Sequence, residues 1–139
     1  MTSPEEAQEI TLRLPGRPEY LLVARLAISG VATRMDFPAE AVEDIKLAIS
    51  EACTYLLERI GSLEPSPELV VRCTLQSEAL SIEVSAEVPT GQTASPQAET
   101  AELTGLGMLI MQCVMDEVEL VQATPSLRIR MVKRRLTPS

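Results

Sequence analysis

Hydrophobic and polar residues alternate along several short segments of the chain. In Glu9–Gly16 the apolar residues Ile10, Leu12 and Leu14 occupy every second position. This alternation predicts a strand with one face buried against a core. It recurs in four later segments, 69–76, 80–88, 116–123 and 127–136. The short turn at 77–79 joins the first two of these, which predicts a hairpin.

Three other segments carry apolar residues at helical spacing. The first covers 17–35, where Pro18 suits a first helical position and the recurring positions are Leu21, Leu22, Arg25, Leu26, Ser29 and Ala32. The second begins at Pro38, and its apolar stripe is Ile45, Ile49, Ala52, Leu56 and Ile60. The third is expected over 105–115, beginning at a pair of glycines.

The expected order is a strand, two helices, a hairpin, a loop, a helix and a second hairpin. Strands and helices grouped in this way, without strict βαβ alternation, favour an α+β two-layer sandwich. A length of 139 residues fits one domain over residues 1–139. The loop at 89–104 has no apolar period and is long enough to suggest function or disorder.

Composition restricts the possible functions. The chain is 45% hydrophobic but only 2% aromatic, so its core must be aliphatic. No apolar run reaches the roughly 18 residues that span a bilayer, and the acidic N-terminal segment does not resemble a secretion signal. We therefore expect no membrane contact and a cytoplasmic location. The net charge of −8 argues against nucleic-acid binding, and the basic segment 132–136 is expected to be a solvated end.

Metal and histidine chemistry are not expected. Cys53, Cys73 and Cys113 form no C-x-x-C pair, and the chain has no histidine. We therefore predict no zinc site, no other metal site and no mechanism that uses a histidine base. The three cysteines are expected to be small buried hydrophobes.

Glu51 and Tyr55 are the first candidates for chemistry. They lie four residues apart, so a helix places them on one side, at the border of the apolar stripe. A carboxylate at the edge of a cleft could act as a general base. The alternative is a partly exposed glutamate beside a tyrosine whose ring covers the core.

Gly105 and Gly107 are the second candidates. Glycines at a helix start allow close approach of a ligand, and the free N–H groups there can hold an anion. The alternative is a flexible hinge that leads into a helix. Between Cys73 and Leu127 there are eight acidic residues and no Lys or Arg, so this half of the chain offers a triphosphate no cation.

Taken together, three segments resemble a known family. They are "RPEYLLVARLAISGVATRMDF", "EDIKLAISEACTYLLERI" and "GLGMLIMQCVMDEVEL", and they resemble the RsbW-like anti-sigma-factor serine kinases of the GHKL ATPase superfamily. The likeness runs from about Glu9 to Leu136 and is weakest over 84–104. It implies the Bergerat, histidine-kinase-like ATPase fold, with a mixed, mostly antiparallel sheet and three main helices on one face.

The resemblance also implies roles for individual residues. The second helix of such kinases carries Glu-x-x-x-Asn, in which the Glu activates the substrate hydroxyl and the Asn binds magnesium. Glu51 matches the base, and Tyr55 replaces the magnesium ligand. The first helix and its flanks hold the sigma factor, which implies partner contacts at Glu19, Tyr20 and Arg25.

The adenine-reading motif of the family is changed as well. It ends Asp-x-Gly, where this chain has Ala86, Glu87 and Val88. The glycines beside the phosphates remain in the sequence Gly105-Leu106-Gly107. Ala86 cannot accept the hydrogen bond from adenine, Val88 adds a side chain where the base should stack, and a phenol is a poor ligand for Mg²⁺.

Three hypotheses follow from the resemblance and its departures. The first is a partner-switching regulator with a degenerate nucleotide site, no cofactor, and a sigma factor or an anti-anti-sigma antagonist as partner. The second is an active serine kinase that uses ATP and Mg²⁺, with Glu51 as base. The third is a sensor whose more apolar pocket takes another ligand. The resemblance further implies a homodimer.

Overall fold

The computed structural model describes residues 7–60, 63–88, 101–123 and 125–135, with the side chains of 101–104 and 123 left undescribed. The five strands are β1 (Gln8–Leu14), β2 (Leu69–Leu75), β3 (Ala79–Glu87), β4 (Glu117–Ala123) and β5 (Ser126–Arg134). The helical elements are the short 3-10 helix η2 (Pro18–Tyr20), α1 (Leu21–Arg34), α2 (Ala39–Ile60) and α3 (Ala101–Val114). The element order is the one that the hydrophobic pattern predicts.

The strands form one sheet in the order β1-β2-β3-β5-β4. All four pairings are antiparallel, so the parallel component of the expected mixed sheet is absent from the described strands. The hairpins β2–β3 and β4–β5 account for two of the pairings, and the β3–β5 pairing brings together segments that lie far apart in the chain.

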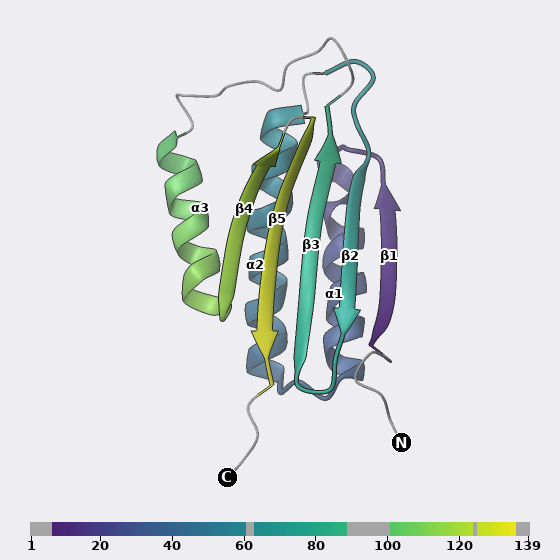
Figure 1. The fold of residues 1–139 in the computed structure, drawn as a ribbon, viewed down its shortest axis with the longest axis vertical. Helices are drawn as coiled ribbons and strands as arrows, with labels where there is room; N and C mark the ends of the chain where they lie inside the picture. Colours follow the sequence, from purple (N-terminus) through teal and green to yellow (C-terminus); the bar gives the residue numbers. More distant parts are fainter. Residues whose placement is uncertain (1–6, 61–62, 89–100, 124, 136–139) are drawn as a thin grey trace.

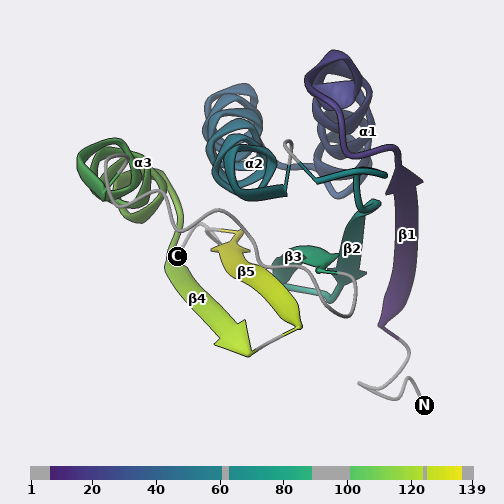
Figure 2. The same ribbon diagram turned by 90° about the horizontal axis from the view of Figure 1, so that it is seen from above.

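The three α-helices cover one face of this sheet, as expected, and the other face is free of helices (Figures 1 and 2). The first two helices lie side by side over the middle of the sheet, and α3 lies beside β4. The apolar stripe predicted for α2 is confirmed, because Ile45, Ile49, Ala52, Leu56 and Ile60 are all 0% exposed.

Of the positions that recur at helical spacing in α1, only Ala32 is buried. The buried residues of this helix are Ala24, Ile28, Val31 and Ala32, whereas Leu22 and Leu26 are 58% and 63% exposed. The helix carries apolar residues on both sides, so helical spacing alone cannot choose between them. The smaller side chains pack inward and the two leucines are left on the surface.

The start of α3 also differs from the prediction. The helix begins at Ala101, four residues before Gly105. Only the first four N–H groups of a helix lack a partner within it, so the amides of Gly105 and Gly107 belong to the helical ladder. Good helix formers at Ala101, Glu102 and Leu103 extend the helix upstream of the glycines.

The basic segment near the C-terminus is not a solvated end over its described part. The Lys133 ammonium donates to the carbonyl of Val114, at the end of α3, over 2.6 Å. The Arg135 guanidinium donates to the carbonyl of Met35, at the end of α1, over 2.9 Å. Cations at helix C-termini are stabilising because the free carbonyls carry partial negative charge.

Candidate functional site

Glu51 and Tyr55 of α2 lie together with Gly107 of α3. They line a cavity between α2 and α3 with a volume of about 50 Å³. The remaining lining residues are Thr54, Glu58, Met108 and Met111. None of the lining residues is a Lys or Arg, and two of them are glutamates. The lining can therefore accept hydrogen bonds from a ligand but offers an anion no counter-charge.

Tyr55 is almost completely buried, with 6% of the residue exposed. Its hydroxyl accepts a hydrogen bond of 3.1 Å from the side-chain amide of Gln122 in β4. The guanidinium of Arg59 stacks over the ring at 3.7 Å from its centroid and also donates to the Tyr55 carbonyl over 3.4 Å. The ring is thus held on its face by a cation–π contact and at its tip by a hydrogen bond.

The tip of Tyr55 reaches the row of the sheet that includes Ala86. Ala86 pairs with Leu127 in β5, and Leu127 pairs with Gln122 in β4. Ala86 is 1% exposed and Val88 is 7% exposed, and the Val88 amide donates to the carbonyl of Pro125 over 2.8 Å. The residues expected to replace the adenine-reading motif are therefore covered and packed, although neither lines the cavity at Glu51.

Glu51 is half-buried and lies against the backbone of α3. A Cβ placed on Gly107 would lie 3.0 Å from the Glu51 Oε1, so a side chain there would require the Glu51 carboxylate to shift. Gly105 has open space around it and Leu106 is 54% exposed. Of the three residues in the glycine motif, the structure brings only Gly107 into the cavity.

Two residues that contact Tyr55, Arg59 and Gln122, could not be identified from the sequence motifs. The spacing of four residues between Tyr55 and Arg59 on one helix could have predicted their contact. Gln122 gives no local signal, because its position beneath the phenol depends on the pairing of β4 with β5.

The three cysteines differ in their burial. Burial raises the pKa of the Cys53 thiol to about 12 and that of the Cys73 thiol to about 11. Cys113 is exposed on α3, so the expectation that all three are buried is wrong for this residue. Among the described residues, no group of His, Cys, Asp or Glu is arranged to hold a metal ion.

The three residues expected to contact a partner lie in η2 and in the first turns of α1. Glu19 is exposed and pairs with Arg17 over 3.6 Å, Tyr20 is half-buried, and Arg25 is exposed. Beside them are the exposed Leu22 and Leu26. This surface lies on the helical layer, on the side of α2 away from α3 (Figure 2).

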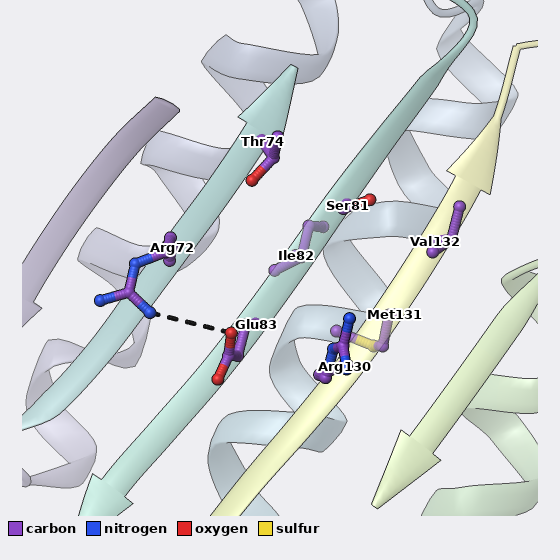
Figure 3. A pocket seen from close by; sticks show the side chains of 8 residues that line it. All are labelled: Arg72, Thr74, Ser81, Ile82, Glu83, Arg130, Met131 and Val132. Atoms are coloured by element: carbon purple, nitrogen blue, oxygen red, sulfur yellow. Dashed lines mark ion pairs between the residues drawn. The ribbon is translucent and has the colours of Figure 1, made fainter. Parts of the chain in front are cut away.

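The helix-free face of the sheet has a different character. Ion pairs cross it from strand to strand, and Figure 3 shows one of them, between Arg72 and Glu83. Glu83 also pairs with Arg128 over 3.5 Å. A polar trough of about 480 Å³ runs beside this network. Of the predicted site residues only Ala86 borders it, so the candidate site lies on the opposite face.

Comparison with known proteins agrees with this architecture. The family model of the histidine kinase-like ATPase domain matches residues 14–133. The chain is 34% identical over 142 residues to the serine-protein kinase RsbW of Bacillus pumilus, covering 93% of this chain and 87% of that protein. It is 30% identical over 138 residues to the serine-protein kinase RsbW of Bacillus subtilis, covering 91% and 86%.

A solved structure shares the fold. It contains the RsbU and RsbW domains of Rv1364c from Mycobacterium tuberculosis and superposes with a TM-score of 0.72 at 15% identity. The match covers 95% of this chain but spans only about a third of that longer chain, 34% of its length. Among the described helices, none combines the length and apolar character needed to cross a membrane. The chain belongs to the family of histidine kinase-like ATPase domains and, within it, to the RsbW-related proteins.

Proposed function

We propose that this protein is a partner-switching regulator of transcription that binds a sigma factor or an anti-anti-sigma antagonist, with a nucleotide site closed by its own side chains. The observation that carries the proposal is the burial of Tyr55. Its phenol replaces the amide that holds magnesium in the family, and it is fixed between Arg59 and Gln122. The proposed unit is a single cytoplasmic domain over residues 1–139.

The described residues do not fit Mg-ATP. Sites for nucleotide-sized ligands have volumes of about 300–1,000 Å³, whereas the cavity beside Glu51 has about 50 Å³. The amides of Gly105 and Gly107 lie within the helical ladder of α3, where they cannot also hold a phosphate. We therefore assign no cofactor and no catalytic step to this site.

The partner surface is proposed at the start of α1. Leu22 and Leu26 are large apolar side chains left in solvent beside the charged Arg25. An exposed apolar patch with a polar rim is typical of protein–protein interfaces. We place the contact with the sigma factor or antagonist here, together with Glu19 and Tyr20, and assign no role to nucleic acid or membrane.

A homodimer is part of the same proposal. β1 lies at one edge of the sheet, so its outer row of backbone N–H and C=O groups is unpaired within the sheet. Ile10 on this strand is 45% exposed. A second copy that covers this edge would bury both features. Light scattering should give twice the chain mass, and a clean species of 15.1 kDa would contradict the dimer.

The experiment is a pair of calorimetric titrations with the sigma factor or antagonist, purified from the same organism, with and without Mg-ATP. We expect the same affinity in both, because the site that would couple nucleotide to partner is closed. An affinity that changes severalfold with Mg-ATP would contradict the proposal that the site is closed. A lack of binding to either partner would contradict the proposed role as a regulator.

A second candidate is an active serine kinase, which the position of Glu51 favours. Its carboxylate is half-buried against Gly107, and the relatives in Bacillus carry the name serine-protein kinase. Incubation with labelled ATP and the antagonist tests it. Transfer of label that is lost in Glu51→Ala and retained in Glu58→Ala, the neighbouring glutamate of the same cavity, would establish the kinase and overturn the first proposal.

A further inference from the structure

We infer that the polar trough on the helix-free face of the sheet binds a small zwitterion, a dipeptide with free termini, between Arg128 and Glu87. The trough has a volume of about 480 Å³, within the range of about 300–1,000 Å³ that is typical of small-molecule sites. It lies on the face of the sheet opposite the cavity at Glu51. The inference therefore does not depend on the proposed function.

The strand register explains why this part of the face is hollow. Four strands, β1, β2, β3 and β5, each place one residue in a row across the sheet, namely Arg13, Val70, Ser85 and Arg128. All four residues line the trough. Val70 and Ser85 are short side chains between two long ones, so the row forms a low floor with a guanidinium at each end.

Arg128 has unused hydrogen-bonding capacity at its end of this row. Its Nη1 donates to Glu83 over 3.5 Å, which is longer than the usual range of about 2.7–3.2 Å, and Glu83 is shared with Arg72 (Figure 3). The Nε of Arg128 is buried and has no hydrogen-bond partner among the described residues. Buried donors without a partner are uncommon in folded proteins. A carboxylate is the acceptor that best fits a guanidinium with free donors.

Glu87 supplies the opposite charge. It lies two residues after Ser85 on β3, so both side chains leave the same face of the sheet, and it lines the trough. Glu83 and Glu87 are the two diagonal neighbours of Arg128 on β3, and Arg128 pairs with Glu83. Glu87 is exposed and has no ion pair with any residue that the structure describes. Its carboxylate is therefore available to an ammonium group.

The charges of the trough favour a zwitterion over a simple anion or cation. The lining contains three Arg and three Glu, so a ligand of a single sign would be repelled by as many groups as attract it. Diagonal neighbours on paired strands lie about 7–8 Å apart, which is about the length of two extended residues. A dipeptide can therefore direct its carboxylate to Arg128 and its ammonium to Glu87.

The test is an NMR titration of the full chain with the dipeptide Ala-Ala. Two blocked peptides serve as controls: N-acetyl-Ala-Ala lacks the ammonium, and Ala-Ala amide lacks the carboxylate. We expect Ala-Ala to bind with a dissociation constant of about 1 mM or below, and each blocked peptide to bind at least about tenfold more weakly. The amide signals of Ser85, Glu87 and Arg128 should shift. No binding of Ala-Ala, equal binding of a blocked peptide, or shifts confined to the cavity at Glu51 would overturn the inference.

Matched variants assign the two ends of the ligand. Arg128→Gln should remove the preference for a free carboxylate, Glu87→Gln should remove the preference for a free ammonium, and both should weaken Ala-Ala binding at least about tenfold. The controls Arg130→Gln and Glu119→Gln break an ion pair of 3.7 Å on the same face, outside the trough lining. They should leave binding within about twofold. Equal losses in the trough and control variants would contradict the assignment.

Glu87→Gln keeps the test decisive if Arg128→Gln fails to fold, because Glu87 is exposed and has no ion pair among the described residues. Circular dichroism melts show which variants fold. Neither variant changes α1 or Tyr55. If Glu87→Gln binds all three peptides as the wild type does, the inference falls and the proposed function stands.

Discussion

The two sides of α2 differ in how far the side chains beside them are exposed to solvent. On the side of α3, Tyr55 and Ala86, which we propose replace polar positions of a nucleotide site, are buried. On the side of α1, the large side chains of Leu22 and Leu26 remain in solvent beside the exposed Arg25. Tyr55 and Ala86 therefore contact other parts of the chain, whereas the two leucines contact solvent.

This contrast underlies our proposal that the domain retains the fold of an ATPase but has changed its use. A buried tyrosine that packs like a core residue stabilises the domain without ligand. Exposed leucines contribute little to folding and are available for association. The energetic roles of the two regions can therefore be separated by substitutions that affect stability on one side and binding on the other.

The largest effect is expected from Tyr55→Ala. Removal of a buried aromatic ring leaves a cavity and should lower the free energy of unfolding by about 3–5 kcal/mol. Leu26→Ala, on the exposed side, should change it by no more than about 0.5 kcal/mol. Urea denaturation of both variants measures the difference, and equal losses would show that the two sides do not differ as described.

A smaller effect is expected from Lys133→Met. Its ammonium caps the end of α3 at Val114 and pairs with Asp44 over 3.4 Å, so its loss leaves a half-buried carbonyl and carboxylate without this donor. The free energy of unfolding should fall by about 1–3 kcal/mol. Arg134→Met, on the same strand with an exposed pair to Glu117, should melt like the wild type. A comparable fall in both variants would mean that the contacts of Lys133 with Val114 and Asp44 stabilise the chain no more than an exposed ion pair does.

Gly105 and Gly107 offer a comparison within α3. Gly105→Ala meets no neighbour within 4 Å and should stabilise the chain by up to about 1 kcal/mol, because Ala favours a helix. Gly107→Ala should gain less, since its Cβ displaces the Glu51 carboxylate. Thermal melts of the two variants measure the gain. Destabilisation by both would instead place the glycines outside the helix.

Ionisation of the thiols should have the smallest effect on the stability of the chain near neutral pH. At pH 8 a disulfide reagent should label Cys113 quickly, and label Cys53 and Cys73 only on unfolding. The pKa values of these buried thiols are raised from 9.0 to about 12 and 11. The unfolded chain therefore releases their protons first, and stability should fall as pH rises above 9. Rapid labelling of all three thiols at pH 8 would contradict their burial.

Local patterns predicted most of the fold. Alternation identified the five strands, and helical spacing identified the buried stripe of α2, because these signals lie within single elements. Helical spacing identified α1 but not its buried face, because Leu26 and Ile28 lie on opposite sides and either side could be buried. It also started α3 at Gly105, since it gave more weight to the glycines than to the helix formers before them.

The candidate site could be predicted only in part. Glu51 and Tyr55 share a helix, so their proximity follows from spacing. The contact of Tyr55 with Gln122 depends on strand pairing between segments 67 residues apart, which no local pattern encodes. The way in which the phenol is held was therefore not visible from the residues themselves, although the replacement of the family's motif residues was.

The closed site is the central claim, and calorimetric titration of the wild type with Mg-ATP tests it, with Tyr55→Asn measured in parallel. We predict no binding heat for the wild type up to millimolar nucleotide. The variant serves as the control for the role of the phenol: if it binds, Tyr55 alone closes the site, and if it does not, Ala86 and Val88 also matter. Clear micromolar binding by the wild type would contradict the account.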